Sequence, residues 1–527
     1  MSKQFNSIYK FFSITSVFCM FWAISTTIFS PRIGVIFSLY RAEHSYKVII
    51  LLNIFCIILS CLIFLSVKFF SDKLQLSEDL NEKRTYIVLF VELLIYSLLI
   101  LIVIKFIGFV NPVDDTRITL SHLHQLEQGN KLGFDYMYSN PQNIFLMYFF
   151  RILRTLFGES YLIIIVSFIV LHCSTILFTF LSLKNMQLTN KLSLIIIQIF
   201  FFALQITLHV PVAYTDILSL FFISASVYFF TKFTFEKTFS ETKTNLIYIV
   251  LTCIFAALGF ISKGTVLIFI IALSVFLFFY GRKWYKFLSL LPFLIMIMFN
   301  FGWNKFIQHE NIFPDDNYGQ PNTHYIMMGL SHTPIPDSLN HQQKSAWSVG
   351  VYDSDDQAYS WNLFLKQRLP KKDIQNKQLA IASQRWRALS VKEKFEVLNN
   401  KASVTWGSGD LKSSFEWKLG VSQSYNRLDI FTNKKTGLIL YCWMMVIQYI
   451  VYIGIILTTI KYFYKKNIIV FFSNIYISGY FFFLLIWESS PRYSMGIFIP
   501  AIIMVGELFS NLQGRKTSKD TCDLKID

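Results

Sequence analysis

Long runs of apolar residues constrain this 527-residue chain more than any other feature. One run extends from about Tyr86 to Val110, and the hydrocarbon core of a bilayer takes only about 20 helical residues. Similar runs recur in blocks rather than in amphipathic stripes, and hydrophobic residues make up 54% of the sequence against 15% charged residues. The pattern predicts a polytopic α-helical membrane protein.

Windows of apolar residues predict about 12 transmembrane helices. They lie near residues 11–30, 48–70, 86–110, 161–182, 192–208, 216–231, 246–261, 265–280, 287–306, 437–460, 467–487 and 494–511. Twelve spans put both termini on one side of the membrane, and the short loops rich in Lys and Arg share that side. By the positive-inside rule this side is the cytoplasm. The net charge of +16 therefore reflects topology in a multi-pass cell-membrane protein surrounded by lipids, and not a nucleic-acid partner.

The predicted spans divide the chain into four regions. An N-terminal transmembrane module at 1–307 contains a first large outer loop at 111–160, and residues 308–436 form a second outer connection that is long enough to be a small extracytoplasmic domain. The C-terminal transmembrane helices occupy 437–512, and 513–527 form a cytoplasmic tail. In the first outer loop, Arg151 and Arg154 lie three residues apart in an apolar and basic segment, which is typical of a helix lying on the membrane surface.

Ionisable and aromatic polar residues gather at span ends on the predicted outer side. The set comprises Asp114 and Asp115 in NPVDDTR, Tyr214 and Asp216 in VAYTD, Lys263 in ISKGT, and Glu488, Arg492 and Tyr493 in WESSPRYS. Taken singly, each is compatible with a solvated helix end, and the lysine with a side chain that snorkels to the interface. Because such groups are costly to dehydrate, their position on one side predicts an outer pocket that contains acids and cations.

The order and sidedness of these segments resemble the GT-C membrane glycosyltransferases related to glycosyltransferase family 39. This group includes protein O-mannosyltransferases and lipid A aminoarabinose transferases. The segments that carry the resemblance are the acidic pair at 114–115, the following PQNIFLMYFFRI, TDILS at 215–219, SKGT at 262–265, HYIMMGL at 324–330 and ESSPRY at 488–493. In addition, NPQN at 140–143 is similar to the YPNN-like motif of bacterial members. The likeness implies a GT-C-like fold.

The resemblance also implies an activity, which is inverting transfer of a sugar from a polyprenyl phosphate to an extracytoplasmic acceptor. The acceptor would be a cell-wall or surface glycan, or a protein. Such a reaction needs a base for the acceptor hydroxyl, and cations that hold the phosphate as negative charge collects on it. An aspartate of the first outer loop would be the base. The family's spacing favours Asp115 over Asp114, and both stay open.

Further site residues follow from the same resemblance. Arg492 and Lys263 would bind the donor phosphate, with Arg151 or Arg154 as a third ligand. The residues expected to orient these groups or contact the acceptor are Glu488, Tyr493, Asp216, Tyr214 and His324.

The chain has no P-loop and no glycine-rich strand-to-helix turn, so the sugar would arrive on a lipid rather than on a nucleotide. DSDD at 353–356 contains a DxD pattern, but on the outer side it favours a solvated acidic turn or a weak cation site. These residues indicate no certain cofactor; a divalent cation is possible, and its ligands are unknown. The alternatives are a Wzy-like polysaccharide polymerase and a lipid or glycan transporter or flippase.

Overall fold

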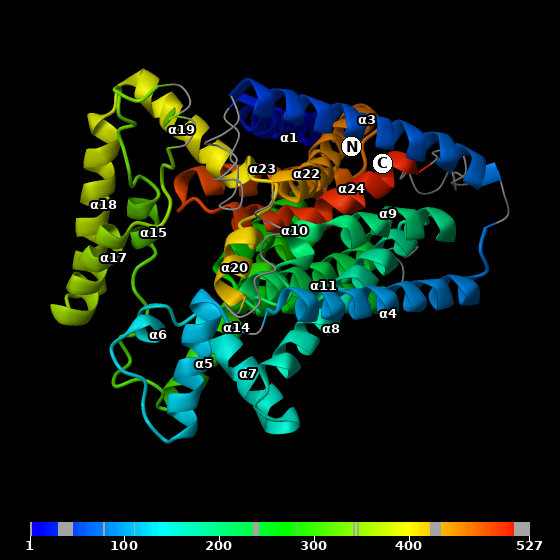
Figure 1. Ribbon diagram of the computed structural model, residues 1–527. Coiled ribbons are helices and arrows are strands. Elements are labelled where there is room, and N and C mark those ends of the chain that lie inside the picture. The colour runs from blue at the N-terminus through cyan, green and yellow to red at the C-terminus, as the bar shows by residue number, and fades with distance from the viewer. Residues whose placement is uncertain are drawn as a thin grey trace.

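The computed structural model describes residues 3–29, 46–76, 79–109, 111–235, 242–281, 283–340, 343–344, 347–421 and 434–510. Helices make up nearly all of this part of the chain, and its β pairing is limited to one isolated antiparallel bridge between Phe109 and Val421 (Figure 1). The predicted tail at 513–527 lies outside the described residues.

Nine helices of the described chain are long and apolar enough to cross a membrane. They are α1 (Lys3–Phe29), α3 (Tyr46–Leu76), α4 (Glu82–Ile107), α8 (Tyr161–Asn185), α11 (Thr215–Phe235), α14 (Leu291–His309) with the end of η3 (Lys283–Leu290), α22 (Lys434–Tyr462), α23 (Ile468–Ile486), and η6 (Pro491–Ile497) with α24 (Phe498–Phe509). The apolar runs therefore located helices of the expected kind, because a run of about 20 apolar residues can satisfy its backbone in lipid only as a helix.

The other three predicted spans correspond to shorter apolar helices. They are α9 (Asn190–Phe202), α12 (Thr242–Ser262), and α13 (Leu267–Tyr280), which follows the single turn η2 (Gly264–Val266). Helix α9 has 13 residues, which extend about 20 Å against a hydrocarbon core of about 30 Å. The short helix α10 (Leu204–Thr207) follows it after Ala203. By the length of the apolar segment, which in α12 is Leu246–Ser262, the predicted spans separate into nine longer and three shorter ones.

Burial shows which helices face protein and which face lipid. Helices α22, α23 and α24 are mostly buried, whereas α3, α4 and α14 expose apolar faces such as that of Phe90 and Ile102 on α4. One polar group interrupts this face, since Glu92 lies within α4 and accepts a hydrogen bond from Gln198 Nε2 at 3.2 Å. No pattern in the sequence indicates this pair, because Gln198 lies on a different helix, α9.

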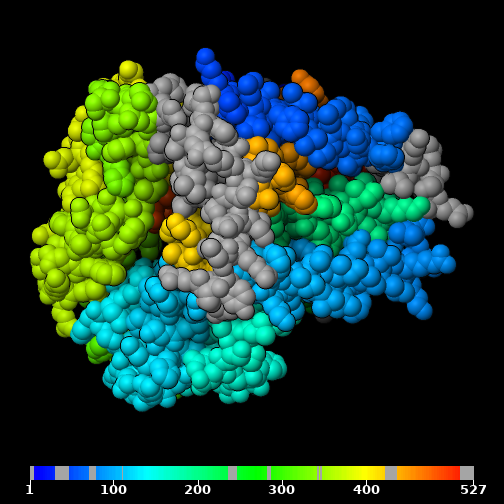
Figure 2. Space-filling view, viewed as in Figure 1, coloured from blue at the N-terminus to red at the C-terminus, as the bar shows by residue number. Residues whose placement is uncertain are grey.

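Both large loops pack on the same end of the bundle, where Figure 2 shows them side by side. The first contains α5 (Asp114–Glu127), α6 (Tyr136–Ser139) and α7 (Asn143–Phe157). The second contains α15 (Thr323–Met328), α17 (Ser354–Trp361), η4 (Asn362–Lys366), α18 (Lys371–Ala388), α19 (Val391–Trp406) and α20 (Ser413–Gly420). Backbone hydrogen bonds join the loops, including Leu132 N to Ile312 O at 2.9 Å and Gly319 N to Tyr138 O at 2.7 Å. We call the second loop the loop domain.

The two ends of the described chain meet at the opposite end of the bundle. Asn467, in the turn between α22 and α23, donates its backbone N–H to Tyr9 Oη at 3.2 Å and its side-chain amide to Glu507 Oε1 at 2.9 Å. Tyr9 belongs to the first helix and Glu507 to the last. The start of α1 and the end of α24 therefore lie on the same side of the molecule.

Candidate functional site

The two adjacent aspartates begin helix α5, directly after span α4. Val113 is extended, with φ −116°, and Asp114 has φ +39° before the helix continues. Carboxylates in a first turn favour the helix because they face its unpaired N–H groups. The exit from α4 is held by Asn111 N, which donates to Gly420 O at 3.1 Å. The turn directs the two side chains to different neighbours.

Asp115 faces Arg492, which belongs to η6 near the C-terminus. Arg492 Nη2 lies 3.4 Å from Asp115 Oδ2, and Tyr136 donates its hydroxyl to Asp115 Oδ1 at 2.6 Å. The side chains of Asp115 and Arg492 are 23% and 16% exposed, so solvent or a ligand can still reach the pair. The sequence placed these two residues on the same side, and the structure brings them into contact.

A second ion pair lies beside the first. Lys263, in the turn between α12 and η2, pairs with Asp216 in the first turn of α11. Burial lowers the pKa of Lys263, and the carboxylate of Asp216 opposes this shift. Aromatic rings connect the two pairs, since Arg492 lies 5.0 Å from the ring centre of Tyr214 and Lys263 lies 5.4 Å from that of Tyr493. Both cations are therefore held by acids and ring faces.

Neutral polar side chains link these groups into one network. Tyr214 donates its hydroxyl to Asn143 Oδ1 at 3.0 Å, and Asn143 Nδ2 donates to the Tyr136 hydroxyl at 3.0 Å. Burial raises the pKa of Tyr136 well above its usual value, so this hydroxyl remains a donor to Asp115. We define the charged cluster as Asp115, Tyr136, Asn143, Tyr214, Asp216, Lys263, Glu488, Arg492 and Tyr493.

Asp114 has a different environment from Asp115. Burial raises the pKa of Asp114, the carboxylate of Glu416 raises it further, and the ammonium of Lys412 lowers it. Lys412 and Glu416 form an ion pair of 3.3 Å at the start of α20. Sequence reasoning missed these two residues. Their spacing of four is an ordinary helical pair, and only the fold of the loop domain brings them to the acidic turn.

Glu488 closes the cluster on the side of the loop domain. It accepts a hydrogen bond from the Tyr493 hydroxyl at 3.4 Å, and burial raises its pKa. Beside it, the buried Lys401 of α19 donates to Trp487 O at 2.7 Å and to Gly329 O. Lys401 therefore ties the loop domain to the turn that carries Glu488. The sequence pattern gave no sign of this role, because Lys401 lies in a helix rich in mixed charges.

Three predicted site residues have their described contacts elsewhere. Arg151 lies 3.8 Å from Glu310, and Arg154 lies 3.2 Å from both Glu127 and Glu159. His324 is buried in the loop domain, where its Nδ1 lies 2.8 Å from Ser360 Oγ and burial lowers its pKa to about 4. The contacts of the two arginines hold α7 in place, and those of His324 belong to the interior of the loop domain. Spacing along the sequence could not separate these contacts from contacts with the charged cluster.

A family model described as "Conserved hypothetical integral membrane protein" matches residues 3–379. The chain belongs to this family of integral membrane proteins. No curated protein and no solved structure matches it. The matched segment of this integral membrane protein includes Asp115, Tyr214 and Lys263, whereas Glu488 and Arg492 lie beyond it.

The DSDD segment of this integral membrane protein has local structural partners. Asp353 caps α17 by accepting from the N–H groups of Asp355 and Asp356 at 3.0 and 2.9 Å. Asp356 forms a bidentate ion pair with Arg385, in which Nη1 and Nη2 each donate to one carboxylate oxygen at 2.7 Å. In the part of the chain that the structure describes, no group of three or more His, Cys, Asp or Glu side chains could hold a metal ion.

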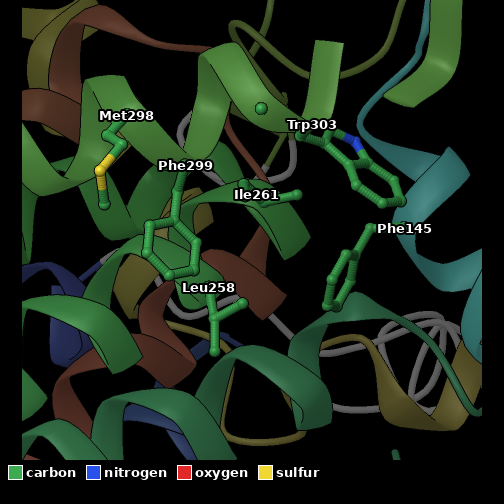
Figure 3. Close-up of a pocket in the computed structure, with 7 residues that line it drawn as sticks. Phe145, Leu258, Ile261, Met298, Phe299 and Trp303 are labelled. Atoms are coloured by element: carbon green, nitrogen blue, oxygen red, sulfur yellow. The ribbon is translucent and has the colours of Figure 1, made fainter. Parts of the chain in front are cut away.

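An apolar groove lies beside the charged cluster, between α7, α12 and α14. It has a volume of about 460 Å³ and is lined by Phe145, Leu258, Ile261, Met298, Phe299, Gly302 and Trp303 (Figure 3). The rings of Phe145 and Trp303 are 5.5 Å apart between centres. Phe145 follows Asn143 by two residues and Ile261 precedes Lys263 by two, so the groove and the cluster use neighbouring residues of the same two segments. Met298 is 60% exposed on α14, on the lipid-facing side of this integral membrane protein.

Proposed function

We propose that this integral membrane protein is a GT-C-type glycosyltransferase related to family 39, which transfers a sugar from a polyprenyl phosphate to a cell-wall or surface glycan acceptor. The observation that carries the proposal is the contact between Arg492 and Asp115, with Lys263 nearby and an apolar groove alongside. A polyprenyl-phosphate sugar has an apolar chain, an anionic phosphate and a polar sugar. The groove, the two cations and the acids match these parts in chemical character.

In the proposed reaction, an acceptor hydroxyl oxygen forms a bond to the anomeric carbon while the bond from that carbon to the phosphate oxygen breaks. Asp115 accepts the hydroxyl proton, and the polyprenyl phosphate leaves with the electron pair. Arg492 and Lys263 stabilise the negative charge that collects on this phosphate. Direct displacement inverts the anomeric carbon, and no covalent enzyme intermediate forms.

The geometry of the Arg492 contact fits such an exchange of partners. At 3.4 Å, the pair with Asp115 is longer than the 2.7–2.9 Å that is typical of a charge-assisted hydrogen bond. In the proposed reaction a phosphate replaces the carboxylate as the partner of Arg492, which frees one oxygen of Asp115 to act as a base. Tyr136 keeps the other oxygen in place with its 2.6 Å hydrogen bond.

The proposed topology has 12 membrane crossings, cytoplasmic termini and an extracytoplasmic site. Its support is the meeting of α1 and α24 at Asn467, because a chain whose ends share one side crosses the membrane an even number of times. Nine crossings would leave the ends on opposite sides. The shorter helices α9, α12 and α13 supply the additional three.

A lipid or glycan flippase is the second candidate function. The observation that favours it is Glu92. This residue lies within span α4, and its carboxylate accepts a hydrogen bond from Gln198 of α9. Ionisable groups within a span often mark a polar path across the membrane. A flippase would move a lipid-linked glycan between leaflets of vesicles without releasing polyprenyl phosphate.

The test measures polyprenyl phosphate released from labelled polyprenyl-phosphate sugars by membranes that contain the protein. We expect Asp115→Asn and Arg492→Ala each to lower release on the order of 100-fold or more, since they remove the base and a phosphate ligand. Arg151→Ala is the matched control, because its 3.8 Å pair with Glu310 lies outside the cluster, and it should retain most activity. Normal release by both cluster variants at normal protein levels would refute the transferase.

A further inference from the structure

The first turn of α19 carries an exposed apolar surface. Val391 is 84% exposed and Phe395 is 65% exposed, and the two residues are one helical turn apart on the same face. The turn is well formed, since Ser390 and Glu393 make a reciprocal capping box at its start. Because the cap fixes this turn of the helix, both side chains are held on the surface.

The first span shows at what depth this surface lies. The indole of Trp22 on α1 stacks on Phe395 with ring centres 6.4 Å apart and planes at 7°, and its Nε1 donates to Asn399 Oδ1 at 3.0 Å. Trp22 lies seven residues before the end of the candidate span Phe5–Phe29. Trp22 therefore lies inside the candidate span, and Phe395, which stacks on it, lies beside the apolar part of α1.

Among the described residues, the start of α19 lies at an edge of the molecule (Figure 1). Figure 1 shows the corner between α18 and α19 at the edge of the molecule next to α1, whereas α7 lies at the opposite edge. Helix α7 also presents exposed apolar side chains, including Ile152 at 57% and Leu156 at 66%. The loop side of the bundle is thus flanked by two apolar helix faces on opposite edges.

We infer that the first turn of α19 inserts into the bilayer leaflet on the loop-domain side, with Val391 and Phe395 among the acyl chains. This lipid contact holds the loop domain against the membrane, and it is independent of the proposed transfer reaction. Charged residues flank the two apolar side chains, as in helices that lie in the membrane interface. They are Arg387, Lys392, Glu393, Lys394 and Glu396, and Lys392 lies 3.8 Å from Glu396. Because these charges nearly cancel, burial of the two apolar side chains, and not attraction to lipid headgroups, would hold this turn in the bilayer.

The test places a photoreactive side chain in the full-length protein in lipid nanodiscs and measures lipid adducts by mass spectrometry. The probes are Phe395→benzoylphenylalanine and Val391→benzoylphenylalanine. Phe301→benzoylphenylalanine, at a 63% exposed position within the span that contains α14, is the positive control, and Leu379→benzoylphenylalanine, at a 43% exposed position on α18, is the reference in the same domain.

We expect lipid adducts at Phe395 and Val391 to approach the yield at Phe301 and to exceed that at Leu379 on the order of tenfold, because only an inserted side chain stays among acyl chains. Yields no higher than at Leu379 would overturn the inference. A cross-link to a second copy of the chain at Phe395 would also overturn it, since the surface would then be a protein interface. A matching thermal transition of each variant shows that the probes leave the fold intact.

Discussion

Adjacent residues with the same side chain have different surroundings in this protein. Asp115 contacts Arg492 and Tyr136, whereas for Asp114 the charges of Glu416 and Lys412 in the loop domain influence the pKa. The sequence could not choose between the two aspartates, because the choice depends on a turn with positive φ and on where α20 packs. Under the proposed function, the contact with Arg492 favours Asp115 over Asp114 as the base.

This difference predicts unequal effects of the two amide substitutions. Asp114→Asn should lower release of polyprenyl phosphate by less than about tenfold, or about 1.4 kcal/mol, because it keeps the shape of the turn and leaves the contacts of Asp115 intact. Release is measured with membranes of each variant at equal protein level. A larger loss for Asp114→Asn than for Asp115→Asn would reverse the assignment of the base.

The buried amine of Lys401 predicts a pH dependence of stability. Burial lowers its pKa to about 7 in the folded protein, against about 10.4 in an unfolded chain. Between these values the unfolded state binds one more proton, so the free energy of unfolding rises with pH by at most about 1.4 kcal/mol per unit. Below about pH 7 both states are protonated and the dependence from this group disappears. A neutral amine has two N–H donors, which suffice for the two carbonyl acceptors.

Thermal unfolding of the purified protein between pH 7 and 9 checks this prediction. The midpoint should rise with pH in the native protein, and Lys401→Met should remove this part of the rise while lowering stability overall, because Gly329 O and Trp487 O lose their donor. Lys344→Met, which removes an exposed pair with Asp337, is the control and should keep the pH slope. An unchanged slope in the Lys401 variant would show that another group titrates.

At the level of elements, glycine backbones hold the loop domain against the end of α23. A Cβ on Gly329 would lie 2.6 Å from Ile486 O and 2.9 Å from Trp487 O, which are backbone atoms that cannot move aside cheaply. Ser489 N also donates to Gly350 O at 2.6 Å. The loop domain therefore docks by direct contact between main chains.

We expect Gly329→Ala to destabilise this docking by about 1–3 kcal/mol through overpacking. Limited proteolysis should then cut the loop domain faster, and transfer activity should fall as Glu488 loses its support. Gly133→Ala is the control, since the nearest atom to its new Cβ is Asp135 Oδ2 at 3.8 Å. Equal protection of the two variants from protease would contradict the docking role of Gly329.

The sequence predicted elements best where one physical force dominates. Runs of apolar residues gave the positions of the long spans, and the amphipathic segment around Arg151 gave a helix at α7, because periodicity and hydrophobicity are local properties. The arrangement of the loop domain could not be read in this way. Its contacts with the span ends use main-chain atoms and a buried lysine, and these leave no periodic pattern.

For the whole molecule, the positions of the ends predict where tags will be found. We expect reporters fused at the N-terminus and the C-terminus to lie on the same side of the membrane. The reason is that Tyr9 near the start of α1 and Glu507 near the end of α24 both contact Asn467. Protease protection in right-side-out and inverted vesicles measures this. Reporters on opposite sides would support nine crossings and would make at least one of the shorter helices re-entrant.

How far the candidate site could be predicted depended on the distance between its parts along the chain. Residues at predicted span ends, such as Asp115, Lys263 and Arg492, could be grouped from the sequence by their predicted side, and they lie close together in the structure. Lys412 and Glu416 could not be grouped in this way, because they reach the site through a fold of about 130 residues that carries no comparable constraint. Arg154 was expected at the site for its charge, and its described partners are Glu127 and Glu159.

The groove between α7, α12 and α14 affects which substrate concentration would set the reaction rate. A ligand that enters sideways from lipid never passes through water, so its effective concentration is its mole fraction among membrane lipids. Under the proposed function, diluting a fixed amount of donor with inert phospholipid should slow the reaction, whereas changing the volume of buffer should not. The reaction rate would then depend on the number of donor molecules per unit area of bilayer.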